Sequence, residues 1–159
     1  MAYYAKLGPG NVVLRVDAVD NDCCIDSEGN ESEDMAINHL TSIHGNDGPW
    51  IKCSYNTCGG FHVDENKKPD GKPGLRANFP GGRYEPEDPW YYNSEYDIFH
   101  KKKPENCESW TLNTTTGYWD PPMPCPEIAR EDIENNKGYI WDEELYQSDN
   151  AKGWVLITP

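Results

Sequence analysis

A hairpin signal in the second half of the chain constrains its fold most. Residues 107–126 carry two short runs of aromatic and β-branched residues, around Trp110 and Trp119, on either side of turn-forming residues at 113–117. This pattern is typical of a β-hairpin. The second run leads into prolines, which have no N–H to donate to a sheet, so the strand must end there. The segment therefore predicts a short hairpin that leaves its sheet at the prolines.

The same plan, two aromatic runs around a polar turn, recurs loosely on both sides of this segment. The earlier copy has its aromatic runs at residues 83–84 and 90–92. The later copy has them at 139–141 and 154–157, joined by an acidic and polar turn. Because an isolated two-stranded hairpin is marginally stable in water, each should pack on a neighbour or on another subunit.

The N-terminal part of the chain predicts a small β-β-α-β module. Residues 2–19 suit a hairpin, with a Gly-Pro-Gly-Asn turn and a β-branched second strand. An acidic loop and a helix follow, with Asn30 as the expected N-cap, Glu33 in the capping-box position and Gly45 as the stop. Residues 50–55 read as the third strand.

These patterns predict an α+β, β-rich fold in three parts. The parts are the β-β-α-β module at 1–63, a polar linker at 64–74 and an aromatic hairpin region with long ordered loops at 75–159. Only 36% of the residues are hydrophobic, and there are 14 Gly and 13 Pro, which suits short strands, turns and small cores. Six Trp and ten Tyr argue against disorder, because disordered chains are poor in aromatic residues.

The formal net charge of −14 restricts the partners of the chain. An acidic surface repels phosphate backbones, so we expect no nucleic-acid partner. No stretch has the length and apolarity of a membrane span, and the N-terminus lacks a charged region followed by an apolar core, so we expect neither a membrane partner nor secretion by a signal peptide.

The six cysteines suggest disulfide bridges. A chain without a signal peptide would first meet the reducing cytosol, so such bridges would form later, outside the cell. Cys107 and Cys125 bracket the central hairpin, and a bridge between them would stabilise the fold by roughly 3 kcal/mol. Cys53 and Cys58 bracket the turn after the third strand and could pair in the same way. A bridge from the adjacent Cys23 or Cys24 to one of these is a rival connectivity.

Metal binding is the sharpest alternative use of these thiols. Cys53, Cys58 and His62 cluster in the sequence, and Cys23 or Cys24 could supply a fourth zinc ligand. The spacing is not the common C-x2-C knuckle, so buried or bridged cysteines are the preferred interpretation. An acidic loop at 20–33 fails the EF-hand register, because isoleucine falls where glycine is required.

Catalysis is not predicted. The four histidines are scattered, and no serine or cysteine lies in a nucleophile-elbow context. We therefore expect no enzyme activity and no cofactor. The aromatic residues are instead interaction candidates, for subunit contacts or for stacking on sugars. They are Trp90, Tyr91, Trp110, Tyr118, Trp119, Trp141 and Trp154.

The order of motifs across nearly the whole chain resembles a group of small virion structural proteins found in tailed phages of marine cyanobacteria and related ocean bacteria. The matching motifs lie at residues 1–7, 54–57, 59–62, 75–79, 81–84, 109–113, 119–124, 139–144 and 154–155. Cys107 and Cys125 depart from the pattern, which has tyrosine between prolines at these places. A bridge between them would therefore be particular to this protein.

The resemblance implies a non-enzymatic virion component, present in many copies and assembled in the host cytoplasm. Decoration or cementing of the capsid surface is the leading expectation, with the major capsid protein as partner. A collar, neck or tail-fibre component, bound to neck or tail proteins, is the first alternative. A module that binds host glycans through exposed aromatic residues is the second, and a zinc-stabilised interaction domain is the third.

Overall fold

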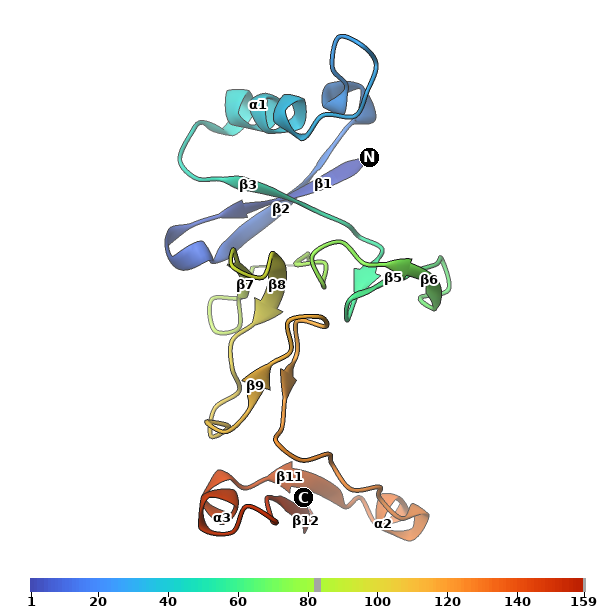
Figure 1. Ribbon diagram of the computed structural model, residues 1–159, viewed down its shortest axis with the longest axis vertical. Coiled ribbons are helices and arrows are strands. Elements are labelled where there is room, and N and C mark those ends of the chain that lie inside the picture. Colours follow the sequence, from blue (N-terminus) through green and yellow to red (C-terminus); the bar gives the residue numbers. More distant parts are fainter. Residues whose placement is uncertain (82–83, 159) are drawn as a thin grey trace. The chain divides into compact units, whose positions relative to one another are not determined.

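The computed structural model describes residues 1–81 and 84–158 (Figure 1). Within them the fold is α+β and β-rich, as predicted: small antiparallel sheets with three short α-helices. No helix in the described part is both long enough and apolar enough to cross a lipid bilayer.

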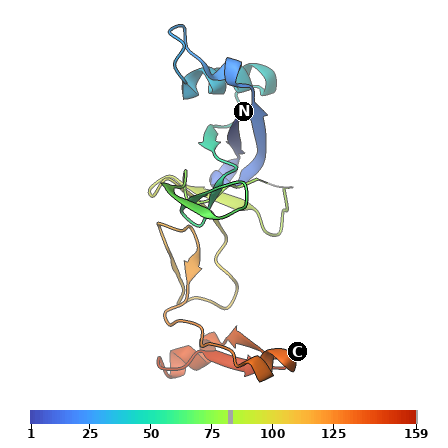
Figure 2. The ribbon, with the colours of Figure 1, turned by 90° about the vertical axis from the view of Figure 1, so that its right-hand side faces the viewer.

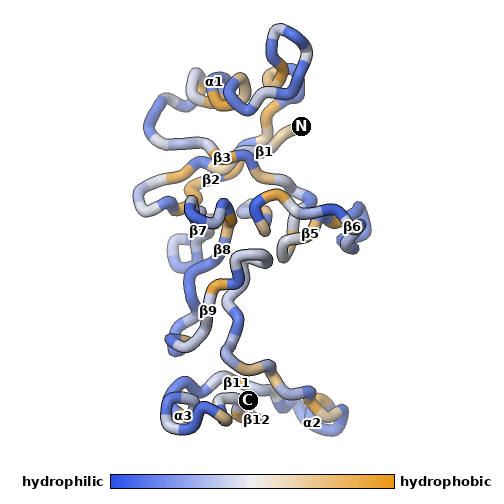
Figure 3. Tube along the Cα trace, in the orientation of Figure 1, coloured by the Kyte–Doolittle hydropathy of each residue, from blue (hydrophilic) through white to orange (hydrophobic). Residues whose placement is uncertain are grey.

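The chain divides into two compact units. The first comprises Met1–Lys102 with Thr114–Tyr118, and the second comprises Lys103–Asn113 with Trp119–Pro159. This division differs from the predicted parts at 1–63, 64–74 and 75–159, because the predicted linker belongs to a sheet of the first unit. It contributes strand β6, whose five residues are all exposed and which is hydrophilic (Figure 3).

The first unit begins with a three-stranded antiparallel sheet in the order β2-β1-β3. Its strands are β1 (Ala2–Leu7), β2 (Val13–Val19) and β3 (Trp50–Cys53), and a short 3₁₀ turn (Pro9–Asn11) joins the first two. The central strand is buried on both faces, because alternate residues point to opposite sides. Tyr4 faces one core, while Ala5 and Leu7 face another.

Helix α1 (Glu33–His44) covers the Tyr4 side of this sheet (Figures 1 and 2). Ala36 and Leu40 are its buried residues. The N-cap is Ser32, whose hydroxyl accepts from the N–H of Met35, and not the predicted Asn30. A 3₁₀ helix (Asn21–Cys24) precedes it. Gly45, at φ 83°, ends the helix as predicted.

The hairpin of β7 (Trp90–Asn93) and β8 (Ile98–Lys101) supplies the second core with Phe99, which is fully buried. We predicted that residues 90–92 pair with 83–84, but they pair with β8. Residue 83 lies outside the described residues. The turn that brings β8 back is built by Asn93, whose side-chain oxygen accepts from the N–H groups of Glu95 and Tyr96.

A buried asparagine organises the centre of the first unit. The Nδ2 of Asn78 donates to the carbonyl oxygens of Phe99 and Thr116, at 3.0 and 2.9 Å, and its Oδ1 accepts from the N–H of Gly59 at 2.9 Å. It thereby joins β8, the segment Thr114–Tyr118 and the sheet of β4 (Thr57–Cys58), β5 (Phe61–Val63) and β6 (Pro69–Pro73).

The second unit contains two of the predicted hairpin pairings. Strand β9 (Thr111–Leu112) pairs with β10 (Trp119–Asp120), and β11 (Gly138–Trp141) pairs with β12 (Trp154–Ile157). Two short helices, α2 (Arg130–Glu134) and α3 (Glu143–Ser148), lie before and after β11. Helix α3 occupies the stretch predicted as a turn, and Asp142 caps it by accepting from the N–H of Leu145.

Candidate functional site

Three of the seven predicted interaction residues form one aromatic cluster in the second unit. Trp141 and Trp154 face each other across the β11–β12 pair, with ring centroids 5.3 Å apart, and Trp110 lies about 6 Å from both. Tyr146 of α3 adds a fourth ring, 5.2 Å from Trp141. All four side chains are partly buried. Because the rings contact one another, the cluster acts as the small core of this unit.

Glu143 fixes the polar side of the tryptophan cluster. Its carboxylate accepts hydrogen bonds from the N–H and hydroxyl of Ser109, from Nε1 of Trp141 and from Nε2 of Gln147, at 2.7–3.1 Å. Burial alone would raise its pKa, but the bonds from Gln147, Trp141 and Ser109 outweigh that effect and lower the pKa to about 2. The carboxylate is therefore a fixed anion that positions rings, and it is a poor proton donor or acceptor near neutral pH.

Three of the other predicted aromatic residues contact a lysine or histidine side chain. Trp90 lies under the ammonium group of Lys101, and Trp119 lies under that of Lys103, each 4.9 Å from the ring centroid. Tyr91 stacks on an imidazole ring, that of His100, at 6.0 Å.

Of the seven aromatic candidates only Tyr118 is exposed, with 47% of its surface accessible. Trp90, Tyr91 and Tyr118 belong to the first unit, while the four other tryptophans belong to the second. The seven rings are therefore divided between the two units.

All six cysteines are free, which corrects the predicted disulfides. Cys107 is buried in the second unit, whereas Cys125 is exposed beyond the prolines that follow β10. Cys53 is buried in β3, and Cys58 points outward from β4, so that pair is not joined either. Bracketing a turn in sequence did not bring the sulfur atoms within disulfide-bonding distance. The rival bridges from Cys23 or Cys24 are also absent.

Cys53, Cys58 and His62 are likewise not gathered into a metal site. The Sγ of Cys58 lies 3.4 Å from the hydroxyl of Tyr118, and Nδ1 of His62 lies 2.8 Å from a carboxylate oxygen of Asp70. Burial raises the pKa of the Cys53 thiol to about 12, so it stays protonated. Across residues 1–81 and 84–158, no three acidic, histidine or cysteine side chains come together as metal ligands.

The acidic loop before α1 uses its carboxylates on its own backbone. Asp26 accepts from the N–H groups of Glu28 and Asn30, both at 2.9 Å, and these bonds lower its pKa. Asp20 caps the 3₁₀ helix that follows it. These carboxylates shape a turn, which is a structural role for the acidic cluster.

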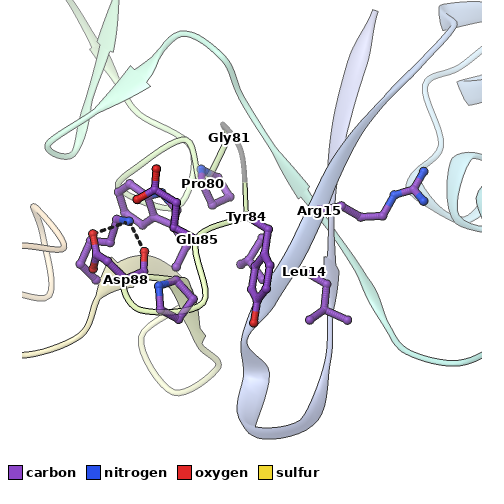
Figure 4. A pocket seen from close by; sticks show the side chains of 11 residues that line it. Leu14, Arg15, Pro80, Gly81, Tyr84, Glu85 and Asp88 are labelled. Carbon is purple, nitrogen blue, oxygen red and sulfur yellow. Dashed lines mark hydrogen bonds and ion pairs between the residues drawn. The ribbon is translucent and has the colours of Figure 1, made fainter.

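A small cavity of the first unit lies between β2 and the segment that leads into β7 (Figure 4). It has a volume of about 160 Å³, below the roughly 300 Å³ at which small-molecule sites begin. Lys101 donates to the carbonyl and the carboxylate of Asp88 at its edge, at 2.6 and 2.9 Å. Leu14 and Tyr84 form exposed parts of the wall. The lining places no nucleophile beside a base, so the cavity offers no evident catalytic chemistry.

Two residues that organise the structure were not predicted from the sequence. Asn78 lies in the motif at residues 75–79, one of those that carry the resemblance. A single asparagine gives no sequence signal that it will be buried and hydrogen-bonded. Glu143 had a usable signal, because Asp142 followed by two glutamates is typical of the first turn of a helix. Comparison with protein-family models, with curated proteins and with solved structures finds no match.

Proposed function

We propose that this chain is a non-enzymatic structural protein of a tailed-phage virion, attached to the capsid surface as a decorating or cementing protein. The observation that carries the proposal is the order of motifs along nearly the whole chain, which resembles that of small virion proteins. Its partner is then the major capsid protein, and many copies bind each particle.

Features of the fold support a role in assembly. The sheets formed by the described residues have two or three strands each, so they leave backbone edges open. Aliphatic and aromatic side chains remain exposed in both units, among them Leu14, Tyr118 and Ile140. Such surface gains stability when a neighbouring protein covers it.

A collar, neck or tail-fibre component is the alternative within the same class, because the resemblance carries no position on the particle. The glycan-binding alternative gains less support, since six of its seven candidate rings are partly buried against neighbours.

Electron microscopy of purified virions, with mass spectrometry of the same particles, tests the proposal. Density for the chain repeated over the head lattice is the expected result. A few copies at a collar or tail vertex would contradict capsid decoration and support a collar, neck or tail-fibre component. Absence of the chain from purified particles would overturn both.

A further inference from the structure

The β11–β12 pair has a second apolar face, opposite the tryptophan cluster. Residues directly opposite each other in an antiparallel pair share a face, and the faces alternate along each strand. Trp141 and Trp154 are opposite each other and face the cluster. The next pair, Ile140 and Val155, must therefore face the other way, and so must Ile157, which lies opposite Gly138.

This second face, formed by Ile140, Val155 and Ile157, is open to solvent. Ile140 is 46% exposed and Ile157 is 36% exposed, while Val155 is partly buried between them. Three β-branched aliphatic side chains on one face of a two-stranded sheet form a surface that is favoured by contact with apolar groups.

An acidic hollow adjoins the second face where β11 ends. Ile140 and Trp141 line it together with Asn106, and its acidic lining residues are Glu108, Asp142, Glu143 and Glu144. Asp142 and Glu143 are engaged as the α3 cap and in the tryptophan cluster. The carboxylates of Glu108 and Glu144 are exposed, and neither forms an ion pair with any residue in 1–81 or 84–158.

The charge of the second unit determines what can cover this face. The unit contains eleven acidic and four basic residues. The basic ones have neighbours of their own: Arg130, Lys137 and Lys152 form ion pairs, and Lys103 lies over Trp119. A second copy would bring the same excess of negative charge to the face, which electrostatic repulsion disfavours. A basic partner would instead neutralise Glu108 and Glu144.

We infer that the second face docks a partner protein whose surface presents aliphatic side chains beside a lysine or arginine. The aliphatic groups cover Ile140, Val155 and Ile157, and the cation enters the hollow between the free carboxylates. In the proposed function this partner is a neighbouring protein of the particle; that identification rests on the proposed function, whereas the docking chemistry does not.

The docking chemistry is tested by nuclear magnetic resonance on the ¹⁵N-labelled full chain. The probe is a synthetic peptide of alternating valine and arginine, and the control probe has glutamate in place of arginine. We expect the basic peptide to shift the amide signals of β11, β12, Glu108 and Glu144, and the acidic peptide to shift none. Shifts located elsewhere, or equal shifts with both peptides, would overturn the inference.

Matched variants separate the two parts of the surface. Ile140→Lys adds a positive charge to the apolar face and should weaken peptide binding about tenfold or more. Glu108→Gln with Glu144→Gln removes two negative charges at the hollow and should reduce the dependence of binding on salt. Ile133→Lys, at an exposed α2 position, is the control and should bind as the parent does. Equal binding by all three would contradict the inference.

Two further measurements identify the occupant. Sedimentation of the parent chain should show a monomer; a dimer that Ile140→Lys abolishes would show that a second copy covers the face, against the inference. Particles that lack the protein should bind the parent and the Ile133→Lys variant, but not Ile140→Lys. If parent and Ile140→Lys bind particles equally, the inference fails while the proposed function stands. If neither the parent nor Ile140→Lys binds particles, the proposed function fails. The docking chemistry is then tested by the peptide titration alone.

Discussion

Glu143 links the stability of the second unit to pH. Its pKa of about 2 lies below its ordinary value of 4.5, so the folded state holds this proton less tightly than the unfolded state. The stability that the carboxylate contributes is fully present above pH 4.5 and is lost as the pH falls toward 2. Unfolding followed by tryptophan fluorescence should therefore show a falling midpoint over this range.

The Glu143→Gln variant isolates this effect. An amide cannot accept all four hydrogen bonds and turns two of its own N–H groups toward donors, so we expect a less stable unit at neutral pH and a smaller loss on acidification. Glu144→Gln is the matched control, since that neighbouring carboxylate is exposed. If the acid dependence of Glu143→Gln equals that of the parent, the assigned role of Glu143 is wrong.

Gly153 is required by the tryptophan cluster. A Cβ atom at this position would lie 2.5 Å from two ring atoms of Trp141, which is closer than real contacts allow. We expect Gly153→Ala to destabilise the second unit by about 1–3 kcal/mol through displacement of the ring. Gly138→Ala, in β11, is the control because nothing lies within 4 Å of the added atom. Equal midpoints in urea for the two variants would contradict this account.

At the scale of elements, Asn78 holds three segments of the first unit together. Asn78→Ala removes two donors and one acceptor and leaves the N–H of Gly59 and the carbonyls of Phe99 and Thr116 without this partner. We expect a loss of roughly 2–4 kcal/mol in unfolding by urea. The exposed Asn56 provides the control, because Asn56→Ala should change stability little. A small effect of Asn78→Ala would show that water replaces its bonds.

Elements with local signals were predictable, and their partners often were not. The first hairpin and the end of α1 follow from glycine and proline positions that act within a few residues. Residues 90–92 were assigned the wrong partner, because pairing with β8 depends on the turn after Asn93 and on burial of Phe99. The N-cap is Ser32 and not the predicted Asn30, because several polar residues in this stretch can cap a helix.

The candidate site was harder to predict than the elements. The sequence indicated that Trp110, Trp141 and Trp154 matter, but exposure is a tertiary property, and these rings face each other instead of solvent. The cysteine pairs failed for the same reason, since spacing along the chain does not determine that Cys107 is buried and Cys125 exposed. The second face of β11–β12 is different. Side chains alternate between the two faces of a strand, so the residues of this face can be deduced once the strand pairing is known.

At the scale of the whole molecule, composition correctly indicated small cores, but it could not locate the boundary between the units. That boundary is discontinuous: Thr114–Tyr118 belongs to the first unit, and the arms on either side of it belong to the second. One contact that ties this segment to the first unit is the bond from Asn78 to Thr116, which joins residues 38 positions apart. No pattern confined to the hairpin itself carries that information.

Two units with separate cores should lose structure separately. The first unit is built on the Tyr4 and Phe99 cores, and the second on the tryptophan cluster. A change confined to the tryptophan cluster, such as Gly153→Ala, should therefore raise amide hydrogen exchange in residues 103–113 and 119–158 while β1, β2 and β3 keep their protection. Mass spectrometry of peptic fragments resolves these segments. A uniform rise in exchange across both units would mean that the chain unfolds as one cooperative structure, and the tryptophan cluster would then contribute to the stability of the first unit as well.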